Sequence, residues 1–493
     1  MSAENDFSVG SIPRHIIDLA IPMTLGQFVQ MAYNLVDRIY IGHLPGTSSM
    51  ALTGLGLTFP IITIIMAFTN LFGTGGMALY SIARGKHDID AERRYMENTF
   101  IMLCLTSIFV MFLGYLFMKP ILYLFGASDV TYPYSAEYLR IYLIGTPLVM
   151  LATGMNGFIN AQGYGRTGMF TILIGAVINI ILDPIFIFGL GLGISGAAIA
   201  TIISQLVSVI WVMAFLCGRK SLTRLRVRRA RFERKAVGQI TRLGVAGFVM
   251  QATNGVVQVA ANNMLGIYGG DIYIGIMTVV NSVRDVVSLP LHGFTNAAQP
   301  VIGYNYGARK ISRIREVIRF TTPVTVTYML FCWAVIFMLP RPIMHVFNSD
   351  PELLAKGVPM LHIFFFGFFF MAFQSVGQST FVGLGKSKQA TFFSLFRKVI
   401  IVVPLTIILP QIGGLGVAGV FLPNRSPISL ADSAAIAPCS GPCADCPAIK
   451  LRDHSFNACS SVFRWTCVFS IDDTAPLQYN IAKELLCFTR YWR

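Results

Sequence analysis

The chain has 493 residues, of which 54% are hydrophobic and only 12% are charged, about half of the roughly 25% charged residues in a soluble protein. Its apolar runs reach the roughly 20 residues that a helix needs to cross a lipid bilayer, and they are too long and continuous for barrel strands of about 10 alternating residues. The net charge of +15 is spread over short loops and forms no single basic face, so composition excludes a soluble domain and a nucleic-acid partner and predicts an all-α polytopic membrane protein.

Eleven membrane spans are expected along the chain. They are residues 15–40, 53–80, 97–118, 136–158, 167–189, 194–217, 241–266, 273–302, 317–340, 357–381 and 391–412. The first fifteen residues are polar and lack the pattern of a signal peptide, so the first span is expected to remain in the protein as a helix.

Lysine and arginine alternate between the loops that join these spans. The second, sixth, eighth and tenth loops are basic, with clusters at 84–94, 219–235, 309–319 and 386–388. The third loop holds only Lys119, and the ninth holds only Arg341 and Lys356. Because basic loops stay in the cytoplasm, we expect the N-terminus and the even-numbered loops there, and a multi-pass protein of the cell inner (plasma) membrane.

The two halves of the chain resemble each other at offsets of 220 to 223 residues. PILYLF at 120–125 matches PIMHVF at 342–347, GYG at 163–165 matches GLG at 383–385, Pro184 matches Pro404, and GISG at 193–196 matches GVAG at 416–419. Six helices in each half would make parallel repeats, related by an axis along the membrane normal. We therefore expect an N-lobe at 1–217, a basic cytoplasmic linker at 218–240 and a C-lobe at 241–420.

The C-terminal residues 421–493 do not continue this pattern. They have no apolar run long enough for a twelfth span and hold six of the nine cysteines, so we expect a poorly ordered, non-homologous tail in place of that helix. Cys439, Cys443 and Cys446 have a spacing used for iron–sulfur clusters. About 70 residues are too few for the enzyme domain that such a cluster serves, and we expect no metal site, no cofactor and no enzymatic activity.

Four polar residues near the outer ends of spans in the first half form a candidate cation-coupling site. Asp37 and Asp183 are carboxylates at similar depth, Asn179 lies one helical turn before Asp183, and Thr201 lies at a matching depth. A charge at the centre of a span costs about 2.5–3.5 kcal/mol and is by default a functional hypothesis. This oxygen-rich cluster suits H⁺ or a hard cation such as Na⁺.

Structural alternatives for these residues remain open. Asp37 is adjacent to Arg38 and the two can form an ion pair, and Asp183 precedes Pro184, which can break the helix. Pro22 lies within the first span and is expected to kink it, with or without a function for the bend.

Amide side chains dominate the candidate cleft of the second half. Gln251, Asn254 and Gln258 share one face of the seventh span, and Gln374 lies in the tenth, so we expect them to line a polar cleft. Arg284 and Asp285 also lie within a span. Being adjacent they point in different directions and need not pair, and the sequence assigns them no role.

Together these residues resemble the multidrug and toxic compound extrusion (MATE) transporters over about residues 10 to 420. The resemblance is carried by Pro22, DRIYIG at 37–42, ALTGLG at 51–56, NIILDP at 179–184 and GISGAA at 193–198. It implies a twelve-helix, two-lobed antiporter that exports organic cations in exchange for H⁺ or Na⁺, and we expect a monomer. By resemblance, Asp37, Asn179, Asp183 and Thr201 match the N-lobe cation site, and Asn254 stands where some members have a glutamate.

The same resemblance bears on the tail. Members of this type often continue with Ala-Glu-Pro-Ile-Ser after Gly-Val-Phe-Leu, and loss of one base from GCC GAA CCG ATC T would give the Pro-Asn-Arg-Ser found at 423–426. The tail is therefore interpreted as a frameshift product. Two alternatives stay open: a lipid-linked precursor flippase of the same superfamily, and a nonfunctional or regulatory protein that lacks the twelfth helix.

Overall fold

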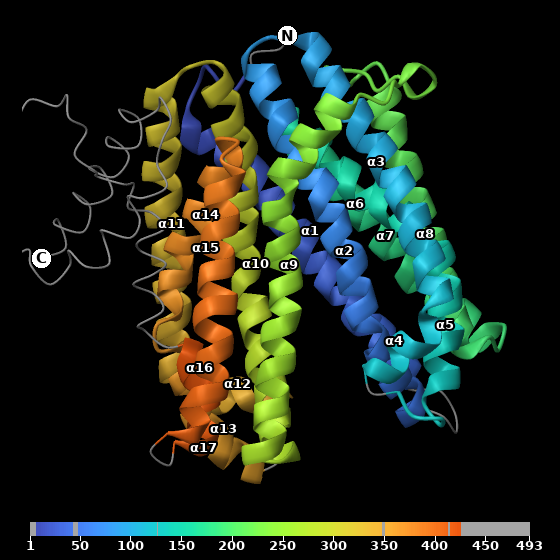
Figure 1. The fold of residues 1–493 in the computed structure, drawn as a ribbon, viewed down its shortest axis with the longest axis vertical. Helices are drawn as coiled ribbons and strands as arrows, with labels where there is room; N and C mark the ends of the chain where they lie inside the picture. The colour runs from blue at the N-terminus through green and yellow to red at the C-terminus, as the bar shows by residue number, and fades with distance from the viewer. Residues whose placement is uncertain (1–5, 43–47, 126, 348–350, 413–414, 425–493) are drawn as a thin grey trace, which may run out of the picture.

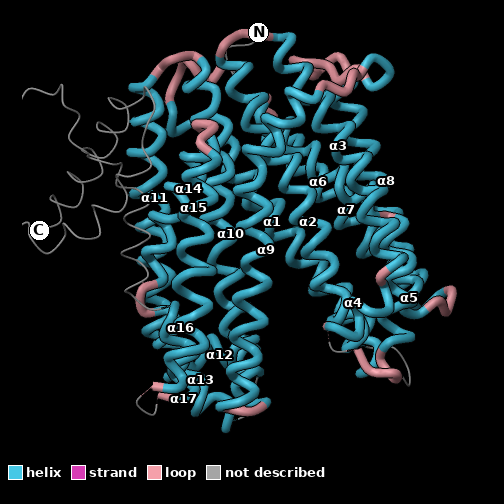
Figure 2. Tube along the Cα trace, in the orientation of Figure 1, coloured by secondary structure: helices cyan, strands magenta, loops and turns pink. Residues whose placement is uncertain are grey.

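The computed structural model describes residues 6–42, 48–125, 127–347, 351–412 and 415–424. These residues form helices joined by short turns and contain no strand (Figure 2). An all-α fold follows from the apolar runs, because in lipid every backbone N–H and C=O must be paired within its own segment. The predicted cysteine cluster lies outside the described residues, and of the residues 423–426 used for the frameshift hypothesis only Pro423 and Asn424 are described.

The first half of the chain forms eight helices. They are α1 (Ile12–Gly42), α2 (Ser48–Gly85), α3 (Ile89–Leu116), α4 (Met118–Leu124), α5 (Tyr132–Ile144), α6 (Thr146–Ala161), α7 (Gly165–Pro184) and α8 (Gly193–Cys217). A π-helical turn, Ile185–Gly189, extends α7 beyond Pro184. Their buried apolar residues make one core that includes Ile65, Leu103 and Phe158, and this unit is the N-lobe.

The second half repeats this arrangement. Its helices are α9 (Arg234–Tyr268), α10 (Asp271–Gly307), α11 (Ile311–Met338), α12 (Pro340–Phe347), α13 (Pro351–Phe365), α14 (Met371–Gly383), α15 (Ser387–Leu395), α16 (Val403–Ile408) and α17 (Gly416–Phe421). A π-helical turn, Phe396–Val402, joins α15 to α16. This C-lobe has its own core, which includes Leu265, Val280 and Phe365. Helix α9 begins inside the segment 218–240 that was expected to be a linker.

Eight helices of the described part are long and apolar enough to cross a membrane, or nine if the pair α5 and α6, bent by 56°, is one span. The expected spans at 15–40 and 391–412 do not meet this test, so the predicted count of eleven is not confirmed. Helix α1 has 31 residues, but one of its sides is polar, as described below. The segment 391–412 is divided between α15, a π-helical turn and α16.

The sequence repeats correspond to repeated local geometry. His87 after α2 and Arg309 after α10, 222 positions apart, both adopt a left-handed backbone, with φ of 58° and 57°. Gly193 and Gly416 open α8 and α17 with φ of 55° and 46°, a conformation that glycine adopts without steric cost. The two halves thus share their turns as well as their helices.

The two lobes lie side by side, with α2–α8 on the right and α9–α17 on the left of Figure 1, and α1 crosses from the C-lobe side, where Ile12 packs with Val301, to the right. They meet near one end of the molecule, where the N-terminus and the basic turns after α2 and α10 lie; we call it the basic end. Glycines allow the backbones to touch there. A Cβ on Gly244 of α9 would lie 1.5 Å from the Leu71 carbonyl oxygen, and one on Gly307 of α10 would lie 2.0 Å from that of Ile82. Toward the opposite end the helices of the two lobes diverge (Figure 1).

Residues 6–10, the N-terminal segment, connect the lobes at the basic end. Four C-lobe side chains donate hydrogen bonds of 2.9–3.2 Å to this segment, and they are Tyr304, Asn305, Lys310 and Arg313. The Arg84 guanidinium of α2 lies 5.2 Å from the ring centres of both Phe7 and Tyr304. Arg84 of the N-lobe, the N-terminal segment and helices α10 and α11 of the C-lobe therefore contact one another.

Candidate functional site

A cavity of about 370 Å³ lies inside the N-lobe, between α1, α2, α5, α6, α7 and α8. Its polar lining residues are Gln30, Tyr33, Asn34, Asp37, Tyr138, Tyr142, Thr153, Asn156, Thr171, Thr201, Gln205 and Ser208. Apolar residues such as Phe59, Ile62 and Met66 of α2 form one wall. A mixed lining of aromatic, apolar and a few polar groups is typical of small-molecule sites.

Helix α1 contributes the most polar side of this cavity. Gln30, Tyr33, Asn34 and Asp37 recur at spacings of three and four residues, so they lie on one face of the helix. The Gln30 amide donates a 2.7 Å hydrogen bond to the Tyr33 hydroxyl oxygen. Asp37 is only 8% exposed. Because of this polar face, the mean hydropathy of α1 is lower than that of the other spans.

Helix α7 places a second carboxylate beside the first. The Asn179 amide donates a 3.1 Å hydrogen bond to Asp183 Oδ1, and both residues are buried. Asn179 Oδ1 and Asp183 Oδ2 are buried without a hydrogen-bond partner among the described residues. Asp183 and Asp37 are close enough for their charges to interact. The four residues predicted from the sequence are therefore grouped on α1, α7 and α8.

The four do not contribute equally to the cavity wall. Asp37 and Thr201 line the cavity, and the Thr201 hydroxyl also donates to the Ala197 carbonyl at 3.0 Å. Asn179 and Asp183 lie one to two turns beyond Gly175 of α7, which lines it. Burial of two neighbouring carboxylates disfavours the charged form of each, because burial removes them from water and their charges repel. Binding of a proton or a small cation relieves both effects, and the oxygens without partners supply ligands for one.

Two structural alternatives for these residues have different outcomes. The side chain of Arg38 is outside the described part of the chain, so its pairing with Asp37 stays a prediction. Helix α7 ends at Pro184 and continues as a π-helical turn, which agrees with a break at Pro184 but does not exclude a further role for Asp183. Pro22 lies inside a helix that runs from Ile12 to Gly42, and its proposed kink stays a prediction.

The sequence reading overlooked the aromatic and amide residues of the cavity. Tyr33 was detectable because it lies one turn before Asp37 on α1. Tyr138, Tyr142 and Asn156 come from α5 and α6. Tyr138 and Tyr142 on α5, and Thr153 and Asn156 on α6, are spaced to share one side of their helix, but only the packing of six helices shows that this side faces the cavity.

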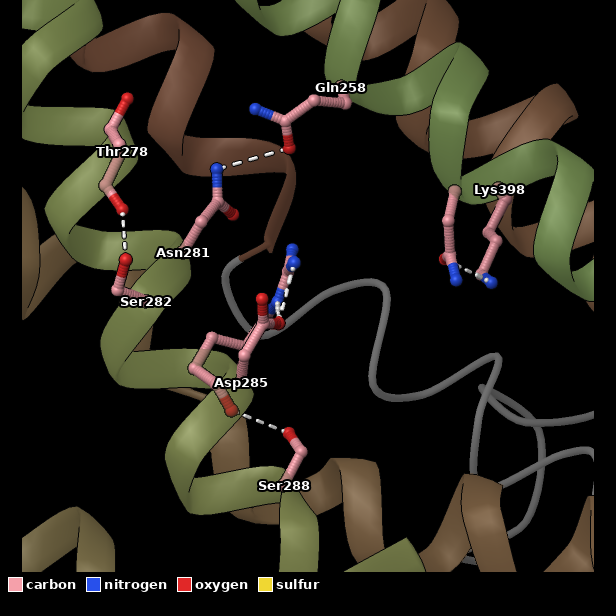
Figure 3. Close-up of polar contacts among 9 residues, drawn as sticks. Gln258, Thr278, Asn281, Ser282, Asp285, Ser288 and Lys398 are labelled. Atoms are coloured by element: carbon pink, nitrogen blue, oxygen red, sulfur yellow. Dashed lines mark hydrogen bonds and ion pairs between the residues drawn. The ribbon is translucent and has the colours of Figure 1, made fainter. Parts of the chain in front are cut away.

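The C-lobe carries a second polar cluster, on α9, α10 and the π-helical turn (Figure 3). Asn281 of α10 donates to the Gln258 amide oxygen at 3.1 Å, and Gln258 donates to Asn262 at 3.3 Å. The Lys398 ammonium donates to Asn254 Oδ1 at 2.6 Å and to the Met250 carbonyl at 3.0 Å. Of the amides predicted to line a cleft, Asn254 and Gln258 thus belong to this cluster.

The remaining C-lobe predictions fared differently. Gln251 of α9 and Gln374 of α14 are half-buried, and their place in a cleft stays a prediction. Arg284 and Asp285, which were expected not to need each other, form a pair in which the guanidinium donates twice to Asp285 Oδ1, at 2.9 and 3.1 Å. The sequence left their pairing open, and the long arginine side chain folds back over one peptide unit to reach its neighbour.

Known proteins resemble the chain over most of its length. The multidrug export protein MepA of Staphylococcus haemolyticus is 26% identical over 414 residues, which cover 83% of this chain and 89% of MepA. MepA of Staphylococcus saprophyticus is 23% identical over 409 residues, covering 83% and 90%.

Solved structures share the fold. One is the outward-facing conformation of a multidrug resistance MATE family transporter of the MOP superfamily, with a TM-score of 0.82, 22% identity and coverage of 88% of this chain and 96% of that one. Another, from Pyrococcus furiosus, is a MOP superfamily transporter described by the reverse polarity of its binding pocket, with a TM-score of 0.81, 22% identity and the same coverage.

The family model MatE matches residues 22–185 and 247–408. These two segments fall in the two lobes and include the candidate cation residues Asp37, Asn179 and Asp183 as well as the amides of α9. The match covers more than half of the chain, and the chain therefore belongs to the MatE family of membrane transporters.

Proposed function

We propose that the chain is a secondary active exporter of organic cations, driven by inward movement of H⁺ or Na⁺. The observation that carries this proposal is the pair of buried carboxylates in the N-lobe, Asp37 at the cavity wall and Asp183 on α7, together with Asp183 Oδ2 and Asn179 Oδ1, which have no hydrogen-bond partner among the described residues. The similarity of the chain to multidrug export proteins supports the proposed class of substrate. The coupling ion takes the place of a cofactor, and the chain acts as a monomer.

The basic end faces the cytoplasm in this proposal, because basic loops are retained there. The lobes touch at that end and diverge toward the other, so the described state is open to the outside. Binding of the coupling ion at Asp37 and Asp183 removes the repulsion between the carboxylates and changes the packing of α1 against α7. That change favours release of the substrate outward, as alternating access requires.

Substitution in cells tests the proposal. Asp37→Asn and Asp183→Asn each remove the charge that attracts the ion, and efflux of a fluorescent organic cation is expected to fall at least about tenfold. Asp18→Asn is the matched control, since this aspartate lies on the same helix but its side chain is 66% exposed. Membrane levels of each variant are measured by immunoblot. Efflux at the wild-type rate from both Asp37→Asn and Asp183→Asn would contradict the proposal.

A further inference from the structure

The internal repeat relates one wall of the N-lobe cavity to the C-lobe cluster. At the offset of 222 residues that relates His87 to Arg309, the α2 positions 59, 62 and 66 correspond to the α10 positions 281, 284 and 288. In the N-lobe these are Phe59, Ile62 and Met66, all of which line the cavity. In the C-lobe they are polar. The repeat thus predicts that the same wall is apolar in one lobe and polar, with an arginine at its centre, in the other.

The contacts of α10 place that arginine on an interior face. Asn281 and Ser288 lie three residues before and four residues after Arg284, so the three share one side of the helix. Asn281 is bonded to Gln258 of α9, and Ser288 is buried with its hydroxyl donating to the Arg284 carbonyl. Figure 3 shows Gln258 and Asn281 pointing toward one another, with Lys398 across the same region. Position 284 therefore lies on the side of α10 that contacts α9 through Asn281.

The charges of this region are predominantly positive. Its charged side chains are the cations Arg284 and Lys398 and the anion Asp285, which pairs with Arg284. The Lys398 side chain is only 7% exposed, and its hydrogen bonds to the Met250 carbonyl and Asn254 hold the ammonium in place. The candidate N-lobe site, in contrast, holds two carboxylates.

The ion pair of Arg284 is suited to exchange. The side chains of Arg284 and Asp285 are 35% and 61% exposed, and an exposed pair contributes only about 0–1 kcal/mol. A guanidinium binds carboxylates through two parallel hydrogen bonds. Arg284 can therefore release Asp285 and receive the carboxylate of a ligand at little cost, while the more buried Lys398 keeps the region positive.

We propose that the C-lobe cluster is an anion-binding half-site, in which Arg284 binds a carboxylate of the transported compound and Lys398 provides fixed positive charge. This inference rests on the proposed function and specifies its substrates as amphoteric compounds. Their cationic group is drawn to the acidic N-lobe and their carboxylate to Arg284. A compound with both groups spans the two lobes, and a purely cationic one uses the N-lobe alone.

A matched pair of dyes tests the half-site directly. The probes are an amphoteric xanthene dye with a cationic ring system and a free carboxylate, and its methyl ester, which keeps the cation and lacks the anion. Binding to the purified full-length chain is followed by fluorescence polarisation, and export from proteoliposomes is measured separately. The wild type is expected to bind the free acid at least about tenfold more tightly than Arg284→Gln does, whereas the ester binds both equally.

Two further variants exclude an indirect effect. Lys356→Gln removes one positive charge from the same lobe, at a residue whose side chain is 42% exposed and paired with Glu352, and it is expected to leave binding of both dyes unchanged. Arg284→Lys keeps the positive charge but lacks the two parallel N–H donors of a guanidinium. It is expected to bind the free acid more tightly than Arg284→Gln and less tightly than the wild type.

The outcomes separate the half-site from the proposed function. The half-site is overturned if Arg284→Gln loses affinity for both dyes equally, or if it binds the free acid as tightly as the wild type does. Export of the ester without binding of the acid by the wild type overturns the half-site and leaves the exporter in place. Selective loss of acid binding in Arg284→Gln supports the half-site even if no dye is exported, a result that would contradict only the proposed function.

Discussion

Asn179 is the residue on which the candidate ion site depends most closely after the two carboxylates. Its amide nitrogen donates to Asp183 Oδ1, and its own oxygen is buried without a described partner. One side chain therefore both fixes a carboxylate and offers a further oxygen to a cation.

Replacing this amide is expected to weaken ion binding without emptying the cavity. A hydrogen bond to a charged group contributes about 1.5–3 kcal/mol, so Asn179→Ala is expected to raise the ion concentration needed for half-maximal export about tenfold or more. Gln205→Ala is the control, because Gln205 lines the cavity on α8 and is not in the predicted ion site. An equal effect of both substitutions on the ion dependence would show that Asn179 has no special part in it.

The types of the site residues were predictable from the sequence, and their surroundings were not. Asp37, Asn179, Asp183 and Thr201 attract notice because polar groups inside apolar spans are costly. The hydrogen bond from Asn179 to Asp183 follows from a spacing of four on a helix. Tyr138 and Asn156 share one side of their helices with Tyr142 and Thr153, but only the packing of α5 and α6 shows that this side faces the cavity.

At the scale of elements, the N-terminal segment acts as a latch between the lobes. Its backbone carbonyls accept hydrogen bonds from Lys310 and Arg313, and Arg84 of the other lobe stacks against Phe7. This contact could not be predicted from the sequence, because the partners lie about 300 positions apart and the segment is short. Opening of the basic end requires these bonds to break.

Removing the principal donor is expected to loosen the latch. Arg313 donates to three carbonyl groups of the segment, so Arg313→Ala is expected to raise the rate at which a maleimide labels Ser8→Cys about fivefold or more. Lys86→Ala removes a positive charge from the same end and serves as control. A labelling rate that Arg313→Ala leaves unchanged would mean that the segment is held by other contacts.

The latch is expected to be insensitive to pH in the physiological range. Burial opposes ionisation of Asp6, but hydrogen bonds from Ser8 and Tyr304 and the charge of Lys310 outweigh it and lower the pKa of Asp6. Because the pKa of Asp6 is lowered, the stabilisation of the latch by ionised Asp6 is complete above the usual pKa of about 3.9. It is lost only as the pH falls through the lower value. Because maleimide reacts with the thiolate, the labelling rate of Ser8→Cys is divided at each pH by the rate of a free cysteine peptide. This ratio should be equal at pH 7 and pH 5, and a higher ratio at pH 5 would contradict this assignment.

At the scale of the whole molecule, the two lobes are held together by close backbone contacts at the basic end. The repeat and the alternation of basic loops predicted two lobes, whereas their closure depends on glycines whose significance appears only when α2 and α9 are packed together. Gly75 of α2 and Gly244 of α9 face one another, and a Cβ on Gly75 would lie 2.8 Å from the Gly244 nitrogen.

A larger residue at this contact is expected to separate the lobes. Gly244→Val places a branched side chain against the Leu71 carbonyl, and overpacking of this kind costs about 1–3 kcal/mol, so the melting temperature of the purified chain should fall. Gly255→Val tests the cost of valine on the same helix, since a Cβ at Gly255 meets nothing within 4 Å. Equal melting temperatures of the two variants would show that the glycine contact does not hold the lobes.

The central claim, that Asp37 and Asp183 couple an ion gradient to export, is tested most directly in proteoliposomes that contain the purified chain. Export of a fluorescent organic cation is measured with a H⁺ gradient alone, with a Na⁺ gradient alone and with neither. The account predicts export with at least one gradient, none without a gradient, and loss of the gradient-driven rate in both Asp37→Asn and Asp183→Asn. Export that is independent of both gradients, or gradient-driven export that survives in both variants, would contradict it.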